Sequence, residues 1–352
     1  MSCVTVHALG DTPAMGYKLI SQLAHAELFT PRPDETLAFY KDLLGLQESG
    51  REGQSVYLRA WGEFFHHSLK ITEGPGPGLG HAAWRTDGPQ ELEDAARRLQ
   101  DAGLEGRWID GDLGHGRAYQ FWMPGGHLFE LVWEVERYVA PPELRSTYPN
   151  RPQRQVARNA AVRRIDHVTV NSLKLTEDLR VFREQLGFRF MEGTLGEGDA
   201  LVFATLTSGA QNHDYAIVAE RPDDPAAKPG RVNHVCWYYD TQGEVLRALD
   251  ILGEHGFRLN MGPSKHGIGE LFFCYVYEPG GNMVELQTGG YWNYIPDWEP
   301  IYWKGGGVEG ANTAWHVSQY GGFGQSPAPE TAGRQHTARE REARSVGSSG
   351  RA

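Results

Sequence analysis

Alternating and periodic apolar positions divide the second half of the chain into strand-like and helix-like segments. Residues 164–172 (RIDHVTVNS) alternate as a half-buried strand does. Residues 175–188 (LTEDLRVFREQLGF) and 242–257 (QGEVLRALDILGEHGF) have the apolar spacing of amphipathic helices, and each has a glycine near its end. Residues 271–288 (LFFCYVYEPGGNMVELQT) are typical of two apolar strands joined by a Pro-Gly-Gly turn. The pattern predicts short strands interleaved with two helices.

The same landmarks recur in the same order in the first half of the chain. The interval from His25 to Gly45 equals that from His167 to Gly187, the interval from His81 to Gly103 equals that from His234 to Gly256, and the segments PGGHLFE and PGGNMVE end at Glu130 and Glu285. Three ordered matches indicate a duplication. We therefore predict an α+β fold in which repeated βαβββ modules, doubled within each half, form two incomplete barrels.

The repeat also predicts the domain organisation. Residues 17–145 form a first domain, which we expect to be non-catalytic, and residues 161–305 form a second, metal-binding domain. A linker rich in proline and arginine joins them over residues 146–160. Residues 306–352 form a C-terminal extension, and beyond about Gly321 its composition is that of a mobile tail.

Composition limits the classes of function. The 352 residues are 40% apolar, enough for two domains with ordinary cores. A net charge of −11 provides no basic surface for a nucleic acid. Neither a membrane span nor a signal peptide is recognisable, so we expect a cytoplasmic protein. The three cysteines have no paired spacing, which argues against disulfides and thiolate metal sites.

Three residues at repeat landmarks suit a metal ion. His167 and His234 lie near the starts of predicted strands, and Glu285 lies on the outgoing strand of the predicted hairpin. Alternation places each on the inner face of a curved sheet. Two histidines and a carboxylate on one side of an Fe(II) ion leave positions open for a substrate and dioxygen. The sequence therefore predicts a metal site formed by His167, His234 and Glu285.

Residues 265–292 (KHGIGELFFCYVYEPGGNMVELQTGGYW) resemble the catalytic segment of type I extradiol catechol dioxygenases of the vicinal-oxygen-chelate superfamily. The resemblance covers about residues 17 to 300. It implies that Glu285 is a metal ligand and that His266 and Tyr275 contact the substrate oxygens. The segment NHDYAI resembles the one that carries the family's acid/base histidine, which corresponds to His213.

The resemblance also implies an activity. Such an enzyme holds Fe(II), occasionally Mn(II), and cleaves a catechol beside the diol with dioxygen to give a muconic semialdehyde. His213 would move a proton during the reaction, because a histidine titrates in the required range. Members of the family commonly form homo-oligomers, so we expect a dimer or tetramer.

The first half departs from this pattern, although it keeps His25, His81 and Glu130. Gln120 stands where Tyr275 stands relative to the Pro-Gly-Gly turn. The interval from His115-Gly116 to that turn is also shorter than the interval from His266-Gly267 to the turn of the second half. Because catalysis needs a whole constellation, we expect the first half to keep its histidines for structure, and the sequence leaves metal binding there open.

Two further features concern the substrate pocket. Homoprotocatechuate enzymes carry an arginine shortly before the second-sphere histidine, and here Met261 stands at that place. A buried substrate carboxylate without a cationic partner is costly, so a neutral catechol or alkylcatechol is favoured, although Lys265 is near. The aromatic run 289–303 either covers the pocket or packs in the core or between subunits.

Three alternatives remain open from the residues. Glyoxalase- and epimerase-type enzymes have similar metal sites, but they do not need the set His213, His266 and Tyr275. Hydroxyphenylpyruvate dioxygenases also have two modules, but the C-terminal residues give no sign of their gating helix. A metal-free small-molecule binding protein is a different class, and it would have no reason to keep all three ligands.

Overall fold

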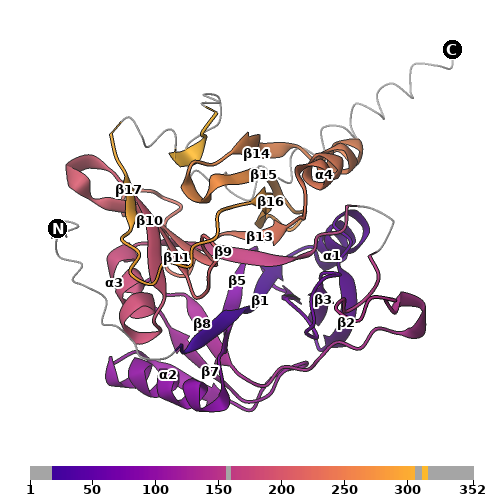
Figure 1. The fold of residues 1–352 in the computed structure, drawn as a ribbon, viewed down its shortest axis with the longest axis horizontal. Coiled ribbons are helices and arrows are strands. Elements are labelled where there is room, and N and C mark those ends of the chain that lie inside the picture. Colours follow the sequence, from indigo (N-terminus) through magenta and orange to yellow (C-terminus); the bar gives the residue numbers. More distant parts are fainter. Residues whose placement is uncertain (1–17, 156–159, 306–310, 316–352) are drawn as a thin grey trace.

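The computed structural model describes residues 18–155, 160–305 and 311–315, and its first half forms an eight-stranded sheet (Figure 1). The order of strands in this sheet is β2-β3-β4-β1-β5-β8-β7-β6. The elements are β1 (Ile20–Thr30), α1 (Pro33–Ala38), the π-helix η2 (Phe39–Leu43), β2 (Gln47–Glu52), β3 (Ser55–Arg59), β4 (Leu69–Glu73), β5 (Gly78–Thr86), α2 (Pro89–Asp101), β6 (Gly106–Ile109), β7 (Ala118–Trp122), β8 (Leu128–Val132) and the 3₁₀-helix η3 (Pro142–Leu144).

The second half repeats this arrangement in a nine-stranded sheet of order β14-β15-β16-β13-β9-β12-β11-β10-β17. Its elements are β9 (Arg164–Ser172), α3 (Leu175–Arg180), the π-helix η4 (Val181–Gln185), β10 (Arg189–Leu195), η5 (Glu197–Asp199), β11 (Leu201–Thr207), β12 (Tyr215–Ala219), β13 (Val232–Tyr238), α4 (Gln242–Glu254), β14 (Leu259–Lys265), η6 (Ile268–Glu270), β15 (Leu271–Tyr277), β16 (Met283–Gly289) and β17 (Ile301–Trp303). Each half contains the βαβββ order twice, so the predicted fold class is confirmed.

The predicted helices form for local reasons. A capping box between the side chains and backbones of Thr241 and Glu244 begins α4, which satisfies free N–H groups of the first turn. Gly256, just beyond its end, has φ +80°, a conformation that glycine adopts without a steric penalty. The helix predicted over 175–188 is present as α3 followed by η4.

The two halves pack against each other through equivalent contacts. A residue in or directly before each Pro-Gly-Gly turn is hydrogen-bonded to a residue of the other half's first helix. The Thr36 hydroxyl donates to Glu278 Oε2 at 2.6 Å, and the Gly125 N–H donates to Asp178 Oδ1 at 2.8 Å. One apolar core runs through both halves, and Trp84 of β5 lies edge-on to Phe182 of η4. The central strands β1 and β9 therefore lie next to each other (Figure 1).

Some predictions concern parts of the chain that the structure does not test. The mobile tail predicted beyond about Gly321 lies outside the described residues, and the four domain boundaries remain predictions. No helix among the described residues is long and apolar enough to cross a membrane.

Candidate metal centre

Two β-bulges aim the histidines of the second half. Where β9 pairs with β13, Asp166 and His167 together lie opposite the single residue Cys236. On β13, Asn233 is an extra residue between the partners of Val170 and Thr169. A bulge turns neighbouring side chains away from strict alternation. Each histidine can therefore contact the side chain of the residue that precedes it.

Those contacts fix which ring nitrogen of each histidine faces inward. His167 Nδ1 donates to Asp166 Oδ2 at 3.0 Å, and His234 Nδ1 donates to Asn233 Oδ1 at 2.7 Å. A neutral imidazole carries one N–H, here at Nδ1, so Nε2 of each ring is the atom left to bind a proton or a metal ion. In metal sites, a hydrogen bond of this kind from the ring nitrogen that does not bind the metal orients the histidine ligand.

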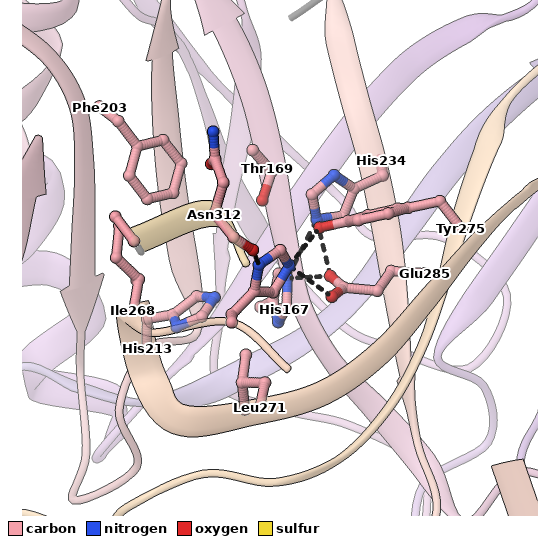
Figure 2. A pocket seen from close by; sticks show the side chains of 12 residues that line it. His167, Thr169, Phe203, His213, His234, Ile268, Leu271, Tyr275, Glu285 and Asn312 are labelled. Atoms are coloured by element: carbon pink, nitrogen blue, oxygen red, sulfur yellow. Dashed lines mark hydrogen bonds and ion pairs between the residues drawn. The ribbon is translucent and has the colours of Figure 1, made fainter. Parts of the chain in front are cut away.

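The two Nε2 atoms converge on Glu285. They lie 3.1 Å from each other, and each lies 3.0 Å from Glu285 Oε2 (Figure 2). All three side chains are buried, and their ligand atoms lie within 4.8 Å of one another. Three lone-pair atoms that face one another repel unless a cation or a proton lies between them. The set of donors therefore fits a divalent metal ion.

The electrostatics of this cluster favour positive charge. Burial by itself lowers the pKa of His167, but hydrogen bonds to Asp166 and Glu285 outweigh it and raise the pKa to about 9. Burial by itself raises the pKa of Glu285, but contacts with His167, His234 and His266 hold it well below its usual range. A carboxylate that stays ionised and a preference for a cation are what a metal site requires.

The other three predicted site residues lie around this cluster. The ring of His213 lies 4.2 Å from that of His167, centroid to centroid. His266 donates through Nδ1 to the Asn312 carbonyl, so its Nε2 accepts from the Tyr275 hydroxyl at 3.1 Å. Tyr275 also pairs directly with Glu285 in the register of β15 and β16. The structure thus brings all six predicted residues together.

Burial shifts the pKa values of two of these groups in opposite directions. It lowers the pKa of His213 well below the ordinary histidine value, and the nearby His167 lowers it further. Burial raises the pKa of the Tyr275 hydroxyl well above its usual value, and Glu285 adds to the effect. His213 is therefore neutral and Tyr275 is protonated around neutral pH.

A small pocket opens onto the cluster. All six residues line it (Figure 2 labels all but His266). Its remaining wall is mostly apolar and consists of Thr169, Phe203, Ile268, Leu271, Ala311 and Asn312. A small apolar pocket with a few convergent polar groups is typical of a site for a small organic molecule.

The Glyoxalase/Bleomycin resistance protein/Dioxygenase superfamily model matches residues 22–131 and 164–286, one match in each half. The chain belongs to this superfamily. Its resemblance to the extradiol dioxygenases of the superfamily is confirmed by a metapyrocatechase of Geobacillus stearothermophilus, which is 39% identical over 84% of this chain and 89% of that protein.

Two further members of the superfamily support the same assignment. A manganese-dependent 2,3-dihydroxybiphenyl 1,2-dioxygenase of Geobacillus genomosp. 3 is 36% identical over 81% of this chain and 90% of that protein. The solved structure of the 2,3-dioxygenase LapB from Pseudomonas sp. KL28 superposes with a TM-score of 0.74 at 28% identity. That superposition covers 81% of this chain and 98% of LapB. Both the fold and the pairing of modules therefore match a dioxygenase of the superfamily.

The sequence missed several residues of this superfamily site. Asp166 and Asn233 immediately precede the two histidines. A polar residue directly before each histidine was the signal in the sequence that could have indicated them. Ala311 and Asn312 belong to the segment beyond the second sheet, and no sequence pattern predicted that they reach the pocket. The C-terminal extension therefore contributes to the pocket wall.

The aromatic run 289–303 does not contribute to the wall of this pocket, and packing of the run between subunits stays a prediction. None of its residues is among those that line the pocket. Instead, β17 pairs with β10, and the indole N–H groups of Trp298 and Trp303 donate to the Met191 carbonyl and to Glu192. The run packs onto the edge of the second sheet.

Proposed function

We propose that this protein cleaves the ring of a catechol outside the diol with dioxygen, at a non-haem Fe(II) ion held by His167, His234 and Glu285. One observation carries the proposal: three buried lone-pair atoms converge at the wall of a small apolar pocket that His213, His266 and Tyr275 also line. The names of the relatives, metapyrocatechase and 2,3-dihydroxybiphenyl 1,2-dioxygenase, support the same chemistry. The product would be a muconic semialdehyde.

His167, His234 and Glu285 would hold the ion, and the ion would supply binding positions for the substrate and dioxygen and a path for electrons between them. Fe(II) is our choice of metal, and Mn(II) is the second candidate because one relative is manganese-dependent. None of the three proposed ligands is a thiolate, and a set of two histidines and a carboxylate suits either ion.

His266 and Tyr275 are proposed to orient the substrate oxygens. The Tyr275 hydroxyl donates to His266 Nε2 and both side chains line the pocket, so a substrate oxygen that replaces this bond would meet a donor and an acceptor already in place. Donors fixed before the substrate arrives stabilise negative charge that develops on an oxygen without further reorganisation.

His213 is proposed to accept and return the proton that the catechol loses. Its side chain is buried, and its Nδ1 atom has no hydrogen-bond partner among the described residues. It lines the pocket beside His167, within reach of a bound substrate. A buried ring nitrogen without a partner is otherwise costly, and a catechol hydroxyl would satisfy it.

The pocket wall favours a neutral catechol. Phe203, Ile268 and Leu271 contribute apolar surface, and no lysine or arginine is among the described residues that line the pocket. Met261 lies directly opposite Tyr275 on the neighbouring strand and is buried. A substrate carboxylate placed there would lose its hydration without gaining an ion pair.

We further propose that the enzyme is a cytoplasmic homo-oligomer, a dimer or a tetramer. Trp292, Tyr294 and Ile295 are exposed together in the loop after β16, which is apolar surface that a second subunit could cover. Light scattering coupled to size-exclusion chromatography measures the number of subunits.

The activity is tested by anaerobic loading of the purified protein with Fe(II), followed by catechol and air. A yellow product whose absorbance depends on pH, with oxygen uptake, is expected. Colourless cis,cis-muconate, or no oxygen uptake with any catechol, would rule out the proposal. Parallel loading with Mn(II) identifies the active metal, because only the competent ion restores turnover.

A further inference from the structure

The first barrel contains a second buried cluster of ligand-type side chains. His25 Nε2 lies 2.8 Å from His81 Nε2, and each of these atoms lies 3.9 Å from an oxygen of Glu130. His115 Nε2 lies 3.6 Å from Glu130 Oε1. The ligand atoms of His25, His81 and Glu130 lie within 4.8 Å of one another. This group is called the first-barrel cluster below.

Hydrogen bonds leave the first-barrel cluster with more lone pairs than protons. His81 donates through Nδ1 to Glu27, and His115 donates through Nδ1 to the Gly116 carbonyl, so both Nε2 atoms are acceptors. Glu130 Oε1 is buried and has no hydrogen-bond partner among the described residues. The other oxygen, Glu130 Oε2, accepts from Gln120 Nε2 at 3.0 Å. A buried carboxylate oxygen without a partner is costly, and a cation would satisfy it.

Strand register places the first-barrel cluster where the second half has its metal centre. Glu27 pairs with His81 as Thr169 pairs with His234. Ala83 pairs with Glu130 as Cys236 pairs with Glu285. His25, His81 and Glu130 therefore occupy the positions in the first barrel that the proposed ligands His167, His234 and Glu285 occupy in the second.

The interior of the first barrel is filled where the second barrel has its pocket. At three equivalent register positions the first half has a larger residue than the second half. These positions hold Glu27 and Thr169, Tyr57 and Thr205, and Lys70 and Ala216. Lys70 bonds Asp112 at 2.6 Å and lies 3.3 Å from Glu27, and the Tyr57 hydroxyl also donates to Asp112. These contacts occupy the space that a substrate would need.

We propose that the first-barrel cluster binds a divalent transition-metal ion such as Zn²⁺ as a closed, structural site. His25, His81 and Glu130 are its ligands, and His115 completes a four-coordinate set. Ligand atoms about 2.1 Å from a tetrahedral ion lie about 3.4 Å apart, so shifts of about half an ångström would bring the ligand atoms of His25, His81 and Glu130 to that spacing. The ion links β1, β5 and β8 to the loop before β7, and it takes no part in ring cleavage.

The test is the number of metal ions bound per chain. Zn²⁺-loaded protein, freed of weakly bound metal and analysed by mass spectrometry, is expected to hold about two ions per chain. Glu285→Gln and Glu130→Gln are each expected to hold about one, and His255→Asn, which changes an exposed histidine, about two. If Glu285→Gln binds none, the proposal is wrong, and this outcome is readable even if Glu130→Gln does not fold.

Co²⁺ tests whether the site is closed. In Glu285→Gln, the remaining Co²⁺ is expected to show the intense visible absorption of a four-coordinate ion. A weak, six-coordinate spectrum would contradict the closed set of four ligands. Because both readouts are independent of turnover, they hold whether or not the protein cleaves catechols.

Discussion

Asp166 Oδ2 accepts a hydrogen bond of 3.0 Å from His167 Nδ1, although the two residues are neighbours in one strand. In a regular strand their side chains would point to opposite faces. The bulge opposite Cys236 brings them together. Asp166 also accepts from Arg164 and Gln287, so its position is fixed from three directions. The proposed ligand is therefore oriented before any metal binds.

Asp166→Asn should weaken metal binding while the fold is kept. The substitution preserves size but removes the charge that orients His167, and loss of such a partner typically costs about 10- to 100-fold in affinity. The dissociation constant for Fe(II) or Mn(II), measured by competition with a chelator, checks this. Asp240→Asn, which alters a carboxylate paired with Arg163 near the surface, is the control. Equal affinities in both variants would refute the orienting role.

His213→Phe should separate catalysis from metal binding. The ring is replaced by one of similar shape that cannot accept a proton, so kcat is expected to fall by about 10²- to 10⁴-fold at unchanged metal content. Glu285→Ala should instead lose the metal of this site. Steady-state kinetics and metal analysis of the same preparations distinguish the two. A His213→Phe enzyme that keeps full activity would remove His213 from the proposed proton transfer.

The apolar pocket predicts a preference against charged substrates. With no lysine or arginine among the described residues of the pocket wall, kcat/KM for catechol should exceed that for 3,4-dihydroxyphenylacetate by at least about 10²-fold, the equivalent of a few kcal/mol. Met261→Arg should narrow this ratio, because it places a guanidinium opposite Tyr275. Met261→Leu controls for the loss of the methionine. Equal kcat/KM values for the two substrates in the wild-type enzyme would contradict the assignment.

His127 should make the stability of the protein fall in mild acid. Its buried ring donates through Nε2 to the Arg231 carbonyl of the other half, and burial lowers its pKa to about 4. The unfolded chain takes up this proton near pH 6.5, whereas the folded chain resists it. The stabilising contribution is therefore complete above pH 6.5 and is lost as the pH falls toward 4. Its size is about 3 kcal/mol.

Denaturant titrations at pH 7.5 and pH 5 measure this loss, and His127→Asn identifies its source. Asparagine is the residue that the second half has at the same place, where Asn282 donates to the Phe29 carbonyl. The variant should show a smaller decrease in the free energy of unfolding between the two pH values. An identical decrease in both proteins would assign the acid sensitivity to other groups.

The sequence alone predicted the repeat, the fold class and the set His167, His234 and Glu285, whereas His213, His266 and Tyr275 were named only through the family resemblance. Strand and helix periodicity, and the spacing of His167, His234 and Glu285 within the repeat, are properties of the chain itself. Periodicity records only which face a side chain takes, and it does so independently of the partner strand. These features were therefore readable before any tertiary structure.

Strand register and long-range packing decided the rest. The bulge that joins Asp166 to His167 depends on which residues of β13 lie opposite, and no local pattern encodes that pairing. The contact of Asn312 with His266 joins segments that are far apart in the chain. The filling of the first barrel by Tyr57 and Lys70 likewise follows from the register of β3 and β4, because only a folded sheet determines which side chains share one interior.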